Sequence, residues 1–224
     1  MKSWLLFLAL LPLSAHGQIE LVPAFGLSIP LGAYAGSDFD NDAHQGATSG
    51  LGLNLEAAYR FNDLVGLALN SGIRWNPYNE AALEGWLERD SPDNYTVSVN
   101  GYENVYAMIG PKIYLGGDKW GLSLSPALGF GHTNFRTAVG YYPGGRLYAY
   151  LTDEFGLAYG IFSTAEARIS DRISLGLHAS FTGGRYNQTG RTSETYNGIT
   201  DSIDIDNTLK PSTILIGICG LIRL

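Results

Sequence analysis

The feature that most constrains the fold is an alternation of apolar and polar residues that recurs along most of the chain. It is clear in the segment 51–61, where leucine, alanine, tyrosine and phenylalanine at the odd positions alternate with a more polar set, Gly52, Asn54, Glu56, Ala58 and Arg60. Successive side chains of a strand point to opposite faces of a sheet. A period of two therefore predicts a strand with one apolar face and one polar face.

The same alternation occurs in eight segments, 19–31, 51–61, 65–75, 105–115, 120–130, 157–169, 173–181 and 214–224. Most are about eleven residues long, which exceeds the usual globular strand and suits a tilted strand in a bilayer. In lipid every backbone N–H and C=O must be paired, so such strands have to close on themselves. The pattern predicts an all-β fold, an eight-stranded antiparallel up-and-down transmembrane β-barrel.

The segments between the predicted strands alternate in length. The short ones are 62–63, 116–119 and 170–171, and the long ones are 33–49, 76–103, 134–156 and 183–211. This predicts short periplasmic turns on one side of the membrane and four long extracellular loops on the other. Pro23, Pro111 and Pro126 fall inside strands, where each removes a backbone donor, so bulges or local bends are expected there.

The N-terminus has the pattern of a secretory signal peptide. Lys2 precedes an apolar run over 4–13, and small residues then suit cleavage before Gln18. We therefore expect a cleaved signal peptide over 1–17 and a barrel domain over 18–224. A retained N-terminal helix is the alternative. Cys219 is the single cysteine, so an internal disulfide is excluded.

With signal peptide, eight alternating strands and alternating connectors, the chain resembles the small outer-membrane β-barrel proteins of the OmpX/OmpA-like kind. The segment 25–32 (FGLSIPLG) is similar to first strands of that superfamily. The resemblance implies a place in the cell outer membrane, contact with its lipid and lipopolysaccharide, and insertion by the barrel-insertion machinery. Family members often end in an aromatic residue, whereas this chain ends in Leu224. The rival fold is a soluble lipocalin-like barrel, which would need a polar exterior.

The face predicted to line the barrel interior carries charged residues, Glu56, Arg60, Arg74, Lys112, Glu166, Arg168 and His178. An eight-stranded barrel is only wide enough for side chains to fill it, and buried charges must pair. These residues are therefore predicted to form a plug of salt bridges and hydrogen bonds. The alternative is a narrow gated pore in which Glu56 or Glu166 exchanges partners among the arginines. Arg60 and Arg168 lie near the short turns and could meet water.

The negative net charge of −7 resides in the predicted long loops. Such a surface disfavours nucleic acid and favours divalent cations, basic ligands or basic proteins. Asp38, Asp40 and Asp42 form a D-x-D-x-D run, but Ala43 and Ser49 stand where an EF-hand loop needs glycine and glutamate. A looser cation site and a solvated loop remain open there, and equally at a second acidic run, Asp201, Asp204 and Asp206.

The segment 78–89 has helical spacing of its apolar residues, which predicts a short amphipathic helix packed on its own barrel or facing a partner. A lipid-modifying enzyme is the third functional class, but Asn134 stands where a nucleophile would follow His132. No zinc or phosphate-binding motif is present, and no cofactor is expected. The sequence favours a non-enzymatic barrel with a structural or surface-interaction role, with a narrow channel for ions or small solutes as the alternative.

Overall fold

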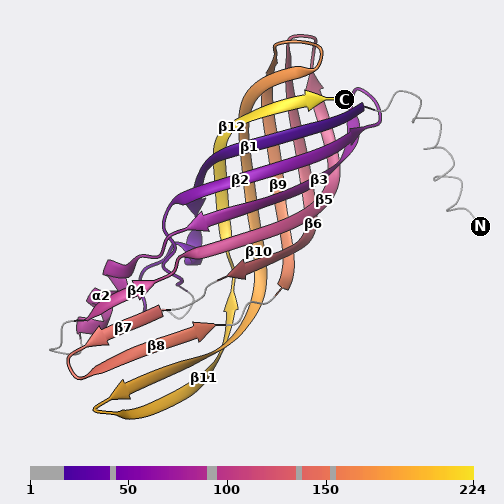
Figure 1. Ribbon diagram of the computed structural model, residues 1–224. Helices are drawn as coiled ribbons and strands as arrows, with labels where there is room; N and C mark the ends of the chain where they lie inside the picture. Colours follow the sequence, from indigo (N-terminus) through magenta and orange to yellow (C-terminus); the bar gives the residue numbers. More distant parts are fainter. Residues whose placement is uncertain (1–17, 41–43, 90–94, 135–137, 152–154) are drawn as a thin grey trace, which may run out of the picture.

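Eight long strands close into an antiparallel barrel, as the alternation predicts (Figure 1). The computed structural model describes residues 18–40, 44–89, 95–134, 138–151 and 155–224. Each barrel strand pairs with the next along the chain, and the last pairs with both its predecessor and β1, which closes the cylinder. The strands are β1 (Gln18–Pro30), β2 (Gly50–Arg60), β3 (Val65–Asn76), β5 (Tyr102–Gly116), β6 (Trp120–Asn134), β9 (Phe155–Arg168), β10 (Ile173–Tyr196) and β12 (Ser212–Arg223).

Regular structure continues beyond the barrel at the end away from the short turns (Figure 1). The elements there are η2 (Gly32–Tyr34), α2 (Glu80–Arg89), β4 (Thr96–Val99), β7 (Ala138–Tyr142), β8 (Gly145–Leu151) and β11 (Ile199–Leu209). The strands form an extracellular sheet in the order β11, β10, β8, β7, β4. The long extracellular connector predicted over 183–211 is present, but it is mostly a β-hairpin and not an irregular loop, because β10 runs on to Tyr196 and turns back as β11.

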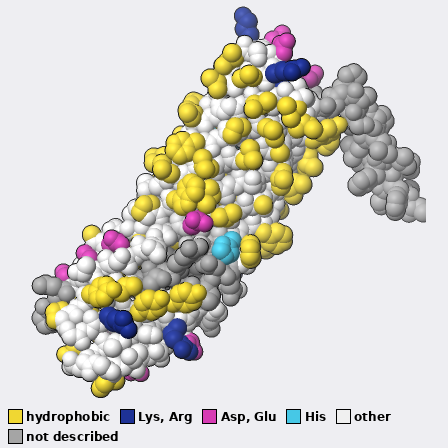
Figure 2. All heavy atoms as spheres, viewed as in Figure 1, with side chains coloured by type: hydrophobic (Ala, Val, Ile, Leu, Met, Phe, Trp, Pro, Cys, Tyr) yellow, Lys and Arg dark blue, Asp and Glu magenta, His cyan; other side chains and the backbone are white. Residues whose placement is uncertain are grey.

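The two faces of the barrel wall differ as predicted, with apolar side chains outside and polar or charged side chains inside. Leucine, isoleucine and phenylalanine point outward, and Leu128 and Leu175 keep 70% and 57% of their surface exposed. Figure 2 shows hydrophobic side chains spread over the barrel wall, with charged side chains gathered toward its two ends. Arg74 and Lys112 point inward and are fully buried. Among the described residues, no helix is long and apolar enough to cross a membrane.

Prolines interrupt the strand pairing without adding a residue. In the β5–β6 ladder Ile109 pairs with Leu128 and Ile113 with Leu124, so the same register holds on both sides of the gap. By that register Pro111 faces Pro126, and each removes a donor where the other does. Of the bulge or local bend expected there, the bulge is absent, because the unpaired stretches 110–112 and 125–127 have equal length and the residue count stays the same on both strands.

The predicted helix over 78–89 is present as α2 and packs on its own chain. Its N-terminal turn is capped by Asn79, whose Oδ1 accepts a hydrogen bond from the Ala82 N–H at 3.2 Å. Leu83 and Leu87 pack against a hydrophobic cluster at the barrel mouth, formed by Tyr34, Ala47, Val97, Val99, Tyr102, Tyr186 and Leu209. The helix therefore stabilises the extracellular sheet above the lumen.

Candidate functional site

The periplasmic half of the lumen holds a cluster of buried charges centred on Lys112. Its Nζ donates to Glu20 Oε2 at 3.1 Å and to Glu56 Oε1 at 2.6 Å. The Tyr114 hydroxyl donates to the same Glu20 oxygen at 3.0 Å. One ammonium thus bridges two buried carboxylates, which ties β1, β2 and β5 together across the lumen.

Arg223 extends this cluster toward the last strand. Its guanidinium donates to Glu166 and, at 2.9 Å, to Ser174 Oγ. Its Nε and the Arg60 Nη1 each lie 3.8 Å from Glu20 Oε1. Glu20, Glu56, Arg60, Lys112, Glu166 and Arg223, here called the lumen cluster, therefore connect strands from both ends of the chain.

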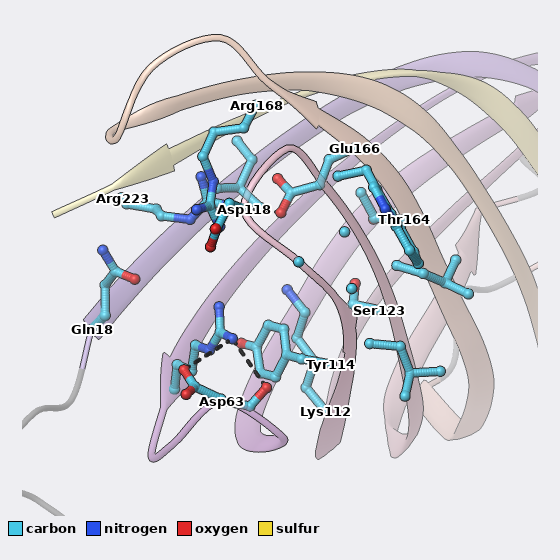
Figure 3. A pocket seen from close by; sticks show the side chains of 18 of the residues that line it. Gln18, Asp63, Lys112, Tyr114, Asp118, Ser123, Thr164, Glu166, Arg168 and Arg223 are labelled. Carbon is cyan, nitrogen blue, oxygen red and sulfur yellow. Dashed lines mark hydrogen bonds and ion pairs between the residues drawn. The ribbon is translucent and has the colours of Figure 1, made fainter.

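A cavity of about 450 Å³ lies at the periplasmic mouth beside the lumen cluster (Figure 3). Figure 3 shows side chains of Lys112, Glu166 and Arg223 around it, with Ser123 and Thr164 on its wall. Arg168 lines the rim and is exposed. Acidic and basic groups both line this cavity, so it suits water and balanced charge better than an ion of one sign.

Arg74 lies apart from the lumen cluster, nearer the extracellular end. It is fully buried, and its guanidinium donates to the Leu53 carbonyl at 2.8 Å and to Ser180 Oγ at 3.1 Å. Its Cζ lies 5.0 Å from the centre of the Tyr106 ring, within cation–π range. No carboxylate pairs with it among the described residues, so carbonyl, hydroxyl and ring electrons compensate its charge.

The lumen is filled further by rings and hydroxyls. His178 lies at 3.3 Å from Thr164 Oγ1 and near the Phe162 ring. Tyr106, Met108 and Phe162 belong to a second buried cluster. At the extracellular mouth the fully buried Tyr34 accepts a hydrogen bond from Asn104 Nδ2 at 2.7 Å. The η2 turn thus places a tyrosine over the opening.

The structure separates the residues expected to form one interior network. Glu56 and Lys112 are bonded directly, Arg60 joins them through Glu20, and Glu166 is held by Arg223. Arg74 and His178 lie in other layers, and Arg168 lies at the rim. Sequence reasoning missed Glu20 and Arg223 as members of the lumen cluster. Both fall on the polar face of their strands, and the antiparallel pairing of β1 with β12 places them opposite each other.

The acidic run in the first loop is used for an ion pair. Asp40 accepts two hydrogen bonds from the Arg89 guanidinium, both at 2.6 Å, and one from Trp86 Nε1 at 3.0 Å. Asp38 accepts one from the Asp40 N–H, and Asp42 lies outside the described residues. No group of three or more His, Cys, Asp or Glu that could hold a metal ion occurs in the part of the chain that the structure describes.

Acidification is expected to break the contacts of Asp40 with Arg89 and Trp86, here called the Asp40 clamp. The Arg89 guanidinium and the Trp86 indole lower the pKa of the exposed Asp40 to about 2. A depressed pKa means that the clamp contributes stability above the ordinary carboxyl range and loses it as pH falls toward 2. Trp86 emission should therefore shift below about pH 4. Asp40→Asn should shift it already at neutral pH and remove that transition, and an identical acid transition in both proteins would contradict the assignment.

One edge of the extracellular sheet is covered by α2. Glu80, Glu84 and Glu88 accept hydrogen bonds from the backbone N–H groups of Val99, Val97 and Tyr95, at 2.7, 2.7 and 3.2 Å. The glutamates are four residues apart on the helix, a rise of about 6 Å, and their N–H partners are two residues apart on an extended chain, a rise of about 6.6 Å. The two spacings match, so each glutamate reaches one N–H group. These glutamates therefore satisfy backbone donors of the edge strand β4 and of Tyr95, the residue before it.

The opposite edge is open in the described structure, where β11 pairs with β10 alone. Ile199 and Ile203 on this strand are 77% and 71% exposed. They alternate with Asp201 and other polar residues, and the Arg191–Asp204 ion pair at 2.9 Å is exposed. Charges on an edge strand discourage uncontrolled pairing with other chains.

A tyrosine row lies on one face of the extracellular sheet. The β7–β8 register places Tyr141, Arg146, Tyr148 and Tyr150 on the same face, and all three tyrosines are exposed. Figure 2 shows hydrophobic and basic side chains gathered on the extracellular end. The His132 ring contacts the exposed Phe155 ring in a tilted arrangement, with ring centres 4.8 Å apart, on the outer wall.

A closed barrel with an aliphatic exterior, a charged and filled lumen and an extracellular sheet defines an outer-membrane β-barrel protein. The chain belongs to the outer membrane protein beta-barrel domain family, whose model matches residues 3–218. The OmpX/OmpA-like resemblance is thereby confirmed, and the protein is one of the outer membrane. No curated protein sequence matches the chain significantly.

Solved structures show the same fold at low identity. A major outer membrane protein from Thermus thermophilus has a TM-score of 0.55 and 12% identity, covering 93% of this chain and 100% of that one. The outer membrane protease OmpT from Escherichia coli has a TM-score of 0.51 and 9% identity, covering 92% and 97%. Ail of Yersinia pestis has a TM-score of 0.47 and 15% identity, covering 92% and 99%. At these identities the first two support the fold alone.

Proposed function

We propose that this protein is a non-enzymatic outer-membrane barrel that binds a surface partner through its extracellular sheet. The observation that carries the proposal is the sheet itself, a regular platform held above the lumen by α2 and the hydrophobic cluster at the barrel mouth. A barrel that serves only as a membrane anchor does not need such a platform. Arg146 and the Arg191–Asp204 ion pair share the face of the tyrosine row, so this face favours a protein partner with acidic groups.

The tyrosine row has the composition of a binding surface. Tyrosine offers a large, rigid contact area with a polar end, and arginine beside it is enriched at protein interfaces. Tyr148 and Tyr150 lie on β8, between β7 and β10, so the sheet holds both at fixed spacing. Partner binding across this face needs no rearrangement of the barrel.

A narrow channel is less well supported by the lumen. The lumen cluster, the layer of Arg74 and Tyr106, and Tyr34 at the mouth occupy the lumen at three successive levels. Ion flow would require all three to move. An enzymatic role has less support still, because the Thr133 hydroxyl donates into the lumen to Asn104 whereas His132 lies on the outer wall against Phe155.

Removing the tyrosine row is expected to abolish surface attachment. Cells that display the wild-type protein should attach to fibronectin-, collagen- or mucin-coated wells several-fold better than cells that display Tyr148→Ser/Tyr150→Ser. Both tyrosines are exposed, so folding should change by no more than about 0.5 kcal/mol. Heat-modifiable gel mobility would verify equal amounts of folded barrel.

Tyr196→Ser is the matched control, because Tyr196 is exposed on the opposite face of the same sheet. It should attach like the wild type. Wild-type cells that attach no better than cells without the protein on any of the three coatings would overturn the proposal. Equal losses in the control and the double variant would place the binding surface elsewhere.

A further inference from the structure

A groove of about 580 Å³ lies on the outer wall of the barrel, at the extracellular ends of β2, β3, β5 and β6. Leu51, Trp75, Glu103 and Asn134 form a cross-strand row along it, each paired in register with the next. Leu51 and Trp75 belong to the outward, lipid-facing set. The groove therefore opens toward the outer leaflet at the level of its headgroups, where tryptophan is enriched in membrane barrels.

Two glycines keep the backbone of the groove closely packed. A Cβ at Gly50 would lie 1.8 Å from the Trp75 carbonyl oxygen, and one at Gly101 would lie 2.6 Å from the Asn76 carbonyl oxygen. Real Cβ atoms do not approach backbone atoms so closely, so neither position admits a side chain. Both glycines line the groove, and the hollow thus depends on residue types that leave it unfilled.

The polar groups of the groove are arranged for a ligand that donates hydrogen bonds. Asn134 is only 8% exposed, and its Oδ1 accepts no hydrogen bond within the described part of the chain. Leaving a buried acceptor unsatisfied costs free energy, which a ligand hydroxyl could recover. The Trp75 Nε1–H donates to Glu103 Oε2 at 3.3 Å, which orients the indole.

We propose that this groove binds a sugar ring of an outer-leaflet glycolipid, with the acyl chains lying on the aliphatic wall below. The indole of Trp75 and the Leu51 side chain suit the apolar face of a sugar ring, while Asn134 and Glu103 accept from its hydroxyls. The described residues that line the groove include no lysine or arginine, and the Glu103 carboxylate among them disfavours a phosphate group. Apolar walls with a few placed polar groups are typical of small-ligand sites of this size.

Three amphiphiles that share one alkyl chain but differ in headgroup test whether the groove prefers a sugar. The protein in phosphatidylcholine nanodiscs is titrated with dodecyl maltoside, dodecyl phosphocholine or octaoxyethylene dodecyl ether, and native mass spectrometry counts the retained molecules. The wild type should retain one maltoside at about tenfold lower concentration than either other amphiphile. Asn134→Leu should weaken that retention about fivefold, because one hydrogen bond is lost. Trp75→Leu should remove the preference for maltoside altogether.

Trp120→Leu is the matched control, since Trp120 is an outward tryptophan at the periplasmic end of the barrel. It should retain maltoside like the wild type. Equal retention of the three amphiphiles, or an unchanged preference in both groove variants, would overturn the proposal. If free maltose competes for the groove as well as dodecyl maltoside does, the ligand is a free sugar, and the proposal of a membrane glycolipid is overturned. The attachment assay above reports on another surface, so the two proposals fail separately.

Discussion

Gly217→Val is expected to prevent closure of the barrel. Gly217 on β12 pairs with Gly26 on β1, across the seam where the last strand meets the first. A Cβ at Gly217 would lie 2.0 Å from the Phe25 carbonyl oxygen, and one at Gly26 would lie 2.2 Å from the Ile216 carbonyl oxygen. The two backbones approach so closely that a side chain must separate the strands. An open seam in lipid leaves backbone donors and acceptors unpaired, at several kcal/mol for each group.

Refolding into detergent or lipid vesicles measures this effect. The unboiled variant should lose the heat-modifiable, folded gel band by tenfold or more under conditions where the wild type folds. Gly220→Val provides the control on the same strand, because no atom lies within 4 Å of a Cβ built at Gly220. It should fold like the wild type. Folding of Gly217→Val to the wild-type level would show that the seam tolerates a wider spacing.

The barrel was predictable from the sequence because its strands face two contrasting solvents. Residues such as Leu53 and Leu55 point into lipid, whereas Asn54 and Glu56 point into the lumen, so the alternation is strong. The short hairpins between β2 and β3, β5 and β6, and β9 and β10 occur where the turn residues predict them. Each of these features is local in the chain, and none requires knowledge of distant contacts.

The extracellular sheet was not predictable in the same way. Water lies beside much of β7, β8 and β11, and their side chains therefore lack the apolar and polar contrast of the barrel strands. Ile203 alternates with Ser202 and Asp204, which gave a loop interpretation for a segment that is a strand. The role of the α2 glutamates was not predictable, because their partners are backbone N–H groups of β4 that no sequence pattern marks.

The sequence predicts that charged side chains line the lumen, but it does not predict which of them pair. Alternation places Glu56 and Lys112 on the inner face, yet the partner of each depends on the stagger of strands around the cylinder. Glu20 and Arg223 come together only through the β1–β12 seam, which joins the two ends of the chain. Arg74 was expected to find a carboxylate and instead contacts a carbonyl, a hydroxyl and the Tyr106 ring.

Lys112→Met is expected to lower the free energy of unfolding by about 3–5 kcal/mol, the range for removing one partner of a buried ion pair. Methionine fills a similar volume, so the loss comes mainly from leaving the Glu56 carboxylate buried without its cation and Glu20 with only the more distant Arg60 and Arg223. Both side chains are almost fully buried, at 1% and 2% exposure. Urea unfolding of the barrel in lipid vesicles, followed by tryptophan emission, measures the change.

Restoring neutrality should recover most of this loss. In Lys112→Met/Glu56→Gln the lumen cluster is again neutral, with Glu20 and Glu166 facing Arg60 and Arg223, and neutral replacement of a buried ion pair is often tolerated. Arg168→Met at the exposed rim is the control and should change stability by no more than about 0.5 kcal/mol. Planar-bilayer recording of the same variants separates the plug from a pore. If the lumen is a plug, the wild type and the double variant conduct no current. A conductance that changes in Glu56→Gln would show that ions pass the lumen cluster.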